Sequence, residues 1–176
     1  MKRISGDERR NHLVSWLKTA TAPMTGSELA ERAGVSRQVI VQDISLLKAK
    51  NEPVIATSEG YIFLHSTKND TLFEKVIVCS HTPEQTKLEL FAIVDHGVTV
   101  KDVKIEHPIY GDLSASVMVS NRNEVEYFLN KVADTNAPLL SQLTEGIHLH
   151  TLQADSLDKI EGACHMLEQI GILVKA

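Results

Sequence analysis

The 176-residue sequence predicts two domains: a winged helix-turn-helix at 1–66, mainly α with a β-hairpin wing, and an α+β domain at 71–176. Two observations predict this division. The first part holds three helix-like stretches followed by two β-like runs. The second part alternates strand-like and helix-like segments in the order βαββαβ, with a trailing αβ. A short polar stretch at 67–70 (ThrLysAsnAsp) is expected to link the two domains.

Helix caps mark the first two helices. Asp7 can cap a helix that runs to about Lys18. Thr25 and Glu28 have the spacing of a capping box and begin a second helix, which ends at Gly34. These signals satisfy backbone groups that a helix end would otherwise leave unpaired.

The join between the second and third helices is a glycine turn of about four residues, which holds the two helices at a steep angle. Ser36 caps the third helix, which runs from Arg37 to about Lys50. After Pro53, the runs ValIleAlaThr and TyrIlePheLeu are joined by SerGluGly, which is typical of a hairpin. Three helices and a hairpin in this order indicate a winged helix-turn-helix.

A helix-turn-helix presents the N-terminal part of its second helix to the major groove of DNA. Arginine can read guanine and glutamine can read adenine through paired hydrogen bonds. The side chains expected to face outward are those of Ser36, Arg37, Gln38, Val41, Gln42 and Ser45. The cations that could hold phosphates are Lys48, Lys50, Arg9 and Arg10. We therefore predict double-stranded operator DNA as a partner, with a solvated face of a protein–protein module as the alternative. Asp43 is assigned no role at DNA.

The charge is divided unevenly between the two domains. Residues 1–66 carry nine Lys/Arg and seven Asp/Glu, a net charge of +2, whereas residues 67–176 carry nine and sixteen, a net charge of −7. The whole-chain charge of −5 would argue against a nucleic-acid partner, but the acidic excess belongs to the second domain. With no signal-peptide pattern, no long apolar run and no CxxC motif, we expect a cytoplasmic protein without a membrane partner.

The second domain is expected to place its helices on one face of a mostly antiparallel sheet. The predicted strands are 73–80, 98–106, 113–120, 148–153 and 172–174, and the predicted helices are 83–95, 123–133 and 157–170. The sequence contains no GxSxG, HExxH, P-loop or GxGxxG motif. We therefore predict a protein that is not an enzyme.

Two histidines share a predicted strand. His148 and His150 are two residues apart, so both imidazoles lie on one face of the sheet. Ile147, Leu149 and Leu152 are expected mostly on the other face. Neighbouring imidazoles can bind a divalent metal, but two ligands do not make a site, and exposed strand histidines are the alternative.

Two further residues have the right chemistry for a metal but an uninformative spacing. His81 follows a predicted strand, and Glu89 lies eight residues later in the next helix, ~10 Å along its axis. This spacing alone does not bring them together. Taken alone, His81 is expected to be a polar residue at a helix start, and Glu89 a solvated one.

Four segments of the chain resemble the niacin-responsive transcriptional repressors of the NiaR type, which join a helix-turn-helix to a three-histidine (3H) domain. The segments are SerGluLeuAla…ValSerArgGln, SHTPEQTKLEL at 80–90, EHPIYGDL at 106–113 and LTEGIHLHTL at 143–152. The helix-turn-helix is shared by many regulators, whereas the three histidine-bearing segments in this order are specific.

The resemblance implies a divalent metal, nickel or zinc, held by His81, Glu89, His148 and His150. It also implies that His107 and Tyr110, in the EHPxYG motif, lie in the ligand pocket or support the metal ligands. Such repressors respond to nicotinic acid, which we expect to act as co-repressor for genes of NAD biosynthesis or niacin uptake.

We further predict a homodimer that reads a two-fold DNA site, because dimers match half-sites separated by whole helical turns. One alternative is a metal-responsive repressor in which the ion is the signal. A second is an enzyme that acts on a small carboxylate, with the metal as Lewis acid and Glu106 or Glu145 as base.

Overall fold

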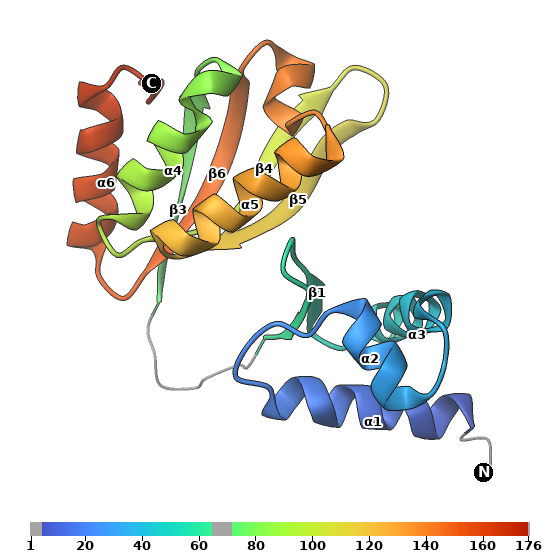
Figure 1. Cartoon of the computed structure of the whole chain (residues 1–176). Coiled ribbons are helices and arrows are strands. Elements are labelled where there is room, and N and C mark those ends of the chain that lie inside the picture. Colours follow the sequence, from blue (N-terminus) through green and yellow to red (C-terminus); the bar gives the residue numbers. More distant parts are fainter. Residues whose placement is uncertain (1–4, 65–71, 176) are drawn as a thin grey trace. The chain divides into compact units, whose positions relative to one another are not determined.

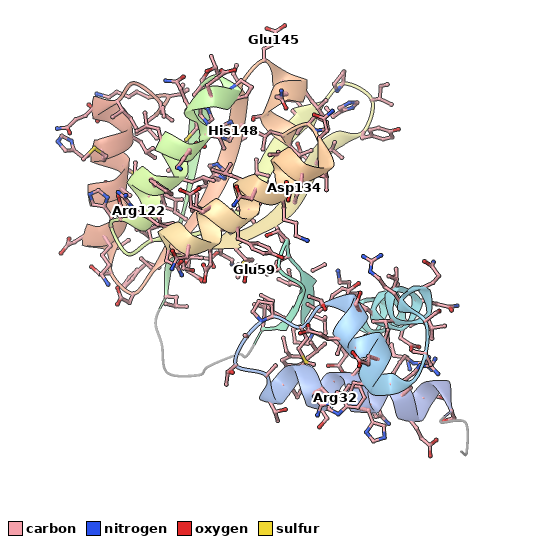
Figure 2. All side chains as sticks on the ribbon, in the orientation of Figure 1. Arg32, Glu59, Arg122, Asp134, Glu145 and His148 are labelled. Carbon is pink, nitrogen blue, oxygen red and sulfur yellow. The ribbon has the colours of Figure 1, made fainter. Side chains whose placement is uncertain are left out.

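A computed structural model describes residues 5–64 and 72–175 of the chain (Figure 1), and Figure 2 shows their side chains in the same orientation. The chain divides into two units, Met1–Lys68 and Asn69–Ala176. Each unit has its own hydrophobic core, and each is described by itself. The linker predicted at 67–70 lies outside the described residues.

The first unit contains the three helices and the hairpin that the sequence predicts. Its elements are α1 (Gly6–Thr19), α2 (Gly26–Ala33), α3 (Arg37–Ala49), β1 (Val54–Ala56) and β2 (Tyr61–Phe63), and the two strands are antiparallel. Thr25 and Glu28 form the predicted capping box, and Ser36 caps α3. Gly34 ends α2 with a φ of 65°, a left-handed conformation that glycine adopts without steric cost.

The start of α1 corrects one prediction. Ser5, not Asp7, caps this helix, because the Ser5 hydroxyl accepts from the Glu8 N–H while the Glu8 carboxylate accepts from the Ser5 N–H. Asp7 instead lies in the first turn and pairs with Arg10 at 2.5 Å.

A buried carboxylate ties α1 to α3. Asp43 is only 2% exposed, and it accepts from Arg9 Nε at 2.5 Å and from Arg10 at 3.1 Å. From the sequence, Arg9 and Arg10 were among the cations that could hold DNA phosphates, and Asp43 was assigned no role at DNA. In the structure both guanidinium groups pair with Asp43 and so join two helices, and their contact with DNA phosphates stays a prediction.

The second unit is an antiparallel sheet with the strand order β3-β6-β4-β5. Figure 1 shows α4 between α5 and α6 over one face of this sheet, which confirms the α+β layers that the alternation predicts. In chain order the elements are β3 (Phe73–Ser80), η1 (Pro83–Gln85), α4 (Thr86–Val94), β4 (Thr99–His107), β5 (Gly111–Val119), α5 (Arg122–Thr135), η2 (Leu140–Thr144), β6 (Ile147–Ala154) and α6 (Leu157–Gln169).

Three elements differ from expectation. The helix predicted at 83–95 begins with a separate 3-10 turn, and a second 3-10 turn precedes β6. The strand predicted at 172–174 makes only one bridge, between Leu173 and Cys79. The segment also makes two backbone hydrogen bonds to β3, from the Ser80 N–H to the Ile172 carbonyl and from the Val174 N–H to the Val78 carbonyl.

Strand β6 buries the side chains of its two histidines on one face of the sheet. His148 and His150 are 2% and 3% exposed, so the alternative of exposed strand histidines is wrong. Leu152 lies on their face and belongs to the core, which corrects its predicted place on the opposite face. The β6 face that carries the histidines is therefore the face that α4 covers.

Candidate functional site

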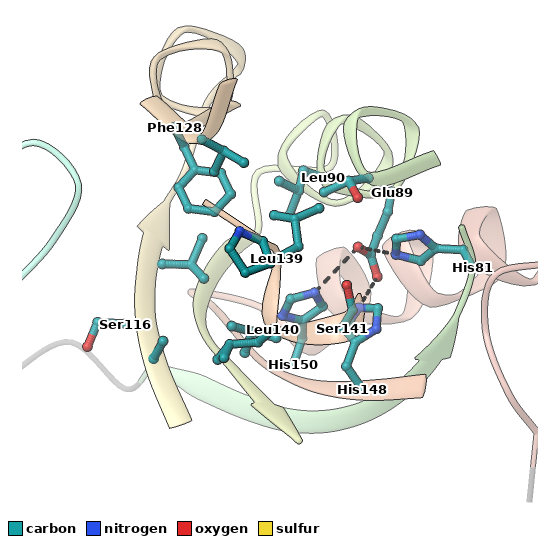
Figure 3. Close-up of a pocket in the computed structure, with 16 residues that line it drawn as sticks. His81, Glu89, Leu90, Ser116, Phe128, Leu139, Leu140, Ser141, His148 and His150 are labelled. Atoms are coloured by element: carbon teal, nitrogen blue, oxygen red, sulfur yellow. Dashed lines mark hydrogen bonds and ion pairs between the residues drawn. The ribbon is translucent and has the colours of Figure 1, made fainter. Parts of the chain in front are cut away.

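Three imidazoles converge on one carboxylate beneath α4 (Figure 3). Glu89 Oε2 lies 2.7 Å from His81 Nε2 and 3.5 Å from His150 Nε2, and Glu89 Oε1 lies 3.1 Å from His148 Nε2. The exposed fraction of all four side chains is 4% or less. The structure thus brings together all four residues that the resemblance assigns to a metal.

The fold explains why spacing alone could not predict this cluster. His81 directly follows β3, and the 3-10 turn η1 then reverses the chain so that α4 runs back over the sheet. Glu89, in the first turn of α4, points down at the end of β3 and at β6. The expectation of a solvated Glu89 is therefore wrong.

The other ring nitrogen of each histidine contacts a backbone carbonyl. The Nδ1 atoms of His81, His148 and His150 lie 2.7, 2.8 and 2.6 Å from the oxygens of Thr82, Gly146 and Asp102, respectively. Because a carbonyl only accepts, each Nδ1 carries the hydrogen and donates it. In the neutral imidazole, each Nε2 then presents a lone pair toward Glu89. Metal-binding histidines are oriented in this way.

A carboxylate and three imidazole lone pairs repel one another unless a positive charge lies between them. Burial opposes protonation of His81 and His150, but the negative charge of the nearby Glu89 carboxylate raises the pKa of both imidazoles. Burial alone would raise the pKa of Glu89, yet the surrounding imidazoles, His150 foremost, hold it well below its usual range. The cluster therefore favours a cation, either a proton or a metal ion.

The donor set fits a divalent transition metal. Three imidazole nitrogens and one carboxylate oxygen are ligands that zinc and nickel accept. His150 Nε2 is a buried atom without a hydrogen-bond partner among the described residues, and such an atom is rare unless an ion or water serves it. The cluster of His81, Glu89, His148 and His150 is therefore a candidate metal site.

Cys79 lies beside this cluster. It pairs with His148 across β3 and β6, and the ligand atoms of Cys79, Glu89 and His148 lie within 4.8 Å of one another. Burial and the Glu89 carboxylate raise the pKa of this thiol. A neutral, fully buried thiol is a weak donor rather than a nucleophile, so Cys79 is suited to support Glu89.

A cavity of about 180 Å³ adjoins the histidines, between the sheet, α4, α5 and η2. Its wall is largely apolar and includes Leu90, Val103, Val117, Phe128, Leu139 and Leu140. An apolar cavity of roughly 150 Å³ holds a benzene ring, so this one has room for a single six-membered ring. No lysine or arginine is among the described residues that line it.

His107 and Tyr110 lie away from this cavity, at the turn between β4 and β5. The two rings are 5.0 Å apart, and His107 Nδ1 accepts from the backbone N–H of Ile109 and Tyr110. Tyr110 is 73% exposed. Neither residue lines the cavity, so their role near a ligand stays a prediction.

The residues predicted to contact DNA lie at the start of α3 and along its exposed side. They are Ser36, Arg37, Gln38, Gln42, Ser45 and Lys48, all exposed. Two of them also serve the helix itself, since Ser36 caps it and the Ser45 hydroxyl donates to the Val41 carbonyl. The side chains that remain available to a partner are those of Arg37, Gln38, Gln42 and Lys48.

Comparisons with known proteins agree with this division of the chain. Residues 74–176 match the model of the 3H domain, and residues 9–62 match a helix-turn-helix (HTH) domain. The transcription repressor NadR of Bacillus subtilis strain 168 is 56% identical over 174 residues, which cover 98% of this chain and 97% of that protein. The probable transcription repressor NiaR of Thermotoga maritima is 34% identical over 168 residues, which cover 96% and 94%. This chain belongs to the NiaR-type family of transcription repressors.

Membership of the NiaR-type family confirms the resemblance seen in the sequence. It favours a regulator over an enzyme, because both relatives are named as transcription repressors. Within the described residues, no helix has the length and hydropathy needed to cross a bilayer.

Sequence reasoning missed several residues of this NiaR-type site. The cavity lining also includes Thr86, Phe128 and Ser141. The sulfur of Cys79 lies near the ligand atoms of Glu89 and His148. Thr86 had a usable signal, because it lies three residues before Glu89 and so shares its helix face. Phe128 and Ser141 gave no such signal, since their places depend on how α5 and η2 pack.

Proposed function

We propose that this chain is a DNA-binding repressor of NAD metabolism that senses nicotinic acid through a metal-containing C-terminal unit. The observation that carries the proposal is the convergence of three imidazoles and Glu89 at one end of a ring-sized apolar cavity. Nicotinic acid acts as co-repressor, and the genes controlled are those for NAD biosynthesis or niacin uptake.

The residues that would hold the ion, nickel or zinc, are His81, Glu89, His148 and His150. When bound, the ion would supply a buried positive charge to which a ligand's carboxylate or ring nitrogen could bind. The backbone carbonyls that accept from the three Nδ1 atoms keep the imidazoles oriented for this task.

The chemistry of the cavity favours an anionic aromatic ligand once a metal is present. The apolar wall suits a six-membered ring, and the volume limits the ligand to about one ring. Glu89 would repel a carboxylate, and no lysine or arginine among the described lining residues offsets that charge. Binding of nicotinate should therefore require the divalent ion.

The first unit supplies the DNA contacts. Helix α3 lies in the major groove with Arg37, Gln38 and Gln42 at base edges and Lys48 at a phosphate. The hairpin of β1 and β2 is the wing of a winged helix-turn-helix. A homodimer reads two half-sites, and nicotinate favours the dimer conformation that matches their spacing, because an effector acts only through its differential affinity for two states.

The test is a mobility-shift assay with the full-length protein and an operator fragment that the protein selects from a random DNA pool. Nicotinate is varied at constant nickel, and nickel is then varied without nicotinate. Tighter DNA binding with nicotinate, lost after chelation and lost in His148→Ala, supports the proposal. The exposed His165→Ala is the matched control. If nickel alone gives the full effect, the ion is the signal and nicotinate sensing is rejected.

A further inference from the structure

One hydroxyl in the cavity has no partner. Thr86, at the start of α4, is 7% exposed, and it lines the cavity together with Glu89 and Leu90. Its Oγ1 atom is buried without a hydrogen-bond partner in the described structure. A buried hydroxyl without a partner is costly, because water would have satisfied it in the unfolded chain.

The histidine cluster explains why this hydroxyl is left over. Threonine and serine in helices commonly donate to the carbonyl four residues earlier, as Thr135 does to Lys131. For Thr86 that carbonyl belongs to Thr82, which already accepts from His81 Nδ1 at 2.7 Å and from the Gln85 N–H at 3.0 Å. Orienting His81 therefore removes the usual acceptor of Thr86.

The position of Thr86 relative to Glu89 suits a second polar contact to a ring. Residues three apart in a helix share a face and are offset by ~4.5 Å along the axis. Thr86 thus lies on the same cavity wall as the carboxylate, about one turn away. Figure 3 shows Phe128 at the end of the cavity away from His81, so a ring whose carboxylate is held at the histidine cluster would extend from it along a wall that Thr86 and the apolar side chains share.

We propose that Thr86 Oγ1 donates a hydrogen bond to the ring nitrogen of a bound pyridine carboxylate, and so makes the site prefer this class over all-carbon aromatic acids. This inference rests on the proposed function, because it assumes a carboxylate ligand at the histidine cluster. Thr86 is then the residue that determines specificity, while the cluster provides the affinity shared by all aromatic carboxylates.

The test measures binding of nicotinate and benzoate to the nickel-loaded full-length protein by calorimetry. Wild-type protein should prefer nicotinate. In Thr86→Val, nicotinate affinity should fall on the order of tenfold, as expected for one lost hydrogen bond, with benzoate affinity unchanged. Thr86→Ser should retain the preference. Thr135→Val, which removes an exposed helical hydroxyl, is the matched control and should bind both ligands as wild type does.

A second readout does not depend on ligand or metal. Valine has the shape of threonine without the unpaired hydroxyl, so Thr86→Val should melt at the same or a higher temperature than wild type in chelator. A lower melting temperature means that the hydroxyl serves the fold, and it overturns the inference.

The two proposals fail in different ways. If nicotinate does not bind the wild-type protein with or without nickel, the proposed sensing function is wrong. If nicotinate binds but Thr86→Val changes the affinities for nicotinate and benzoate equally, or changes neither, the function stands and the role of Thr86 is overturned.

Discussion

His81 Nε2 lies 2.7 Å from Glu89 Oε2, although the two residues are separated by a 3-10 turn and the first turn of a helix. This contact joins the end of β3 to α4, and β6 completes it with His148 and His150. The carboxylate is the only negative charge that faces the three imidazoles in the described cavity lining. It therefore supplies the negative charge that favours a cation at this site.

Glu89→Gln should lower the affinity for nickel or zinc on the order of 100-fold or more, since changes around metal ligands cost 10–100-fold even when no ligand is lost. An amide keeps the size of the side chain but supplies no charge to offset a divalent ion. Competition against a chromophoric chelator measures the effect. Glu84→Gln, at an exposed position in the preceding turn, should bind metal as wild type does. Equal affinities for the two variants would remove Glu89 from the site.

Stability of the chelated protein should depend on pH through the same cluster. The raised pKa values of His81 and His150 stabilise the fold below their ordinary value of 6.5, and this contribution is lost as the pH rises through the raised values. The lowered pKa of Glu89 stabilises the fold above its ordinary value of 4.5, and this contribution is lost as the pH falls through the lowered value. The cluster therefore contributes most between about pH 4.5 and pH 6.5, and the melting temperature should fall above that window.

Added nickel should reverse this trend. The ion requires neutral imidazoles and displaces their protons, so the rise in melting temperature on adding nickel should be larger at about pH 7.5 than at about pH 5.5. Thermal unfolding in chelator and in nickel, at both pH values, measures the difference. The same rise at both pH values would show that the imidazoles do not bind the ion.

The elements of this chain were largely predictable because their signals are local. Each signal acts within one turn of the chain, as do the Ser36 cap, the capping box of Thr25 and Glu28, and the helix-ending Gly34. The cap of α1 was misassigned to Asp7 although Ser5 and Glu8 have the same box spacing. Ser5 and Asp7 compete there, and the choice depends on which side chain reaches the free N–H groups at the helix start.

The site was predictable only in part, because it depends on packing between distant segments. Strand alternation placed His148 and His150 on one face of the sheet. Neither the strand alternation nor the spacing of His81 and Glu89 could predict that α4 packs on that face with Glu89 pointing at the histidines. The contribution of Cys79 depends on the register of β3 against β6. The Thr86 hydroxyl lacks a partner because the Thr82 carbonyl already accepts from His81 Nδ1. No sequence pattern predicts this contact.

Asp43→Ala should destabilise the first unit by about 2–3 kcal/mol, because it leaves Arg9 and Arg10 without their buried partner. Trp16 is the single tryptophan of the chain, so its fluorescence reports on this unit alone during urea unfolding. Asp7→Ala removes a carboxylate that is 81% exposed and also pairs with Arg10, and it should cost less than 1 kcal/mol. Similar losses in the two variants would show that the Asp43 contacts do not hold α1 to α3.

The two kinds of DNA contact proposed for α3 should be separable by experiment. Arg37→Ala removes a side chain assigned to base edges, so it should weaken binding to the selected operator by about 1–3 kcal/mol and relax its sequence preference. Lys48→Ala removes a phosphate contact, so it should weaken binding equally on all sequences and reduce the salt dependence by about one released ion. Fluorescence anisotropy on operator and scrambled DNA, over a range of salt, distinguishes the two effects. Lys159→Ala, on α6 and paired with Asp155, is the control. Should Arg37→Ala and Lys48→Ala behave alike on both DNAs, α3 does not read bases through Arg37.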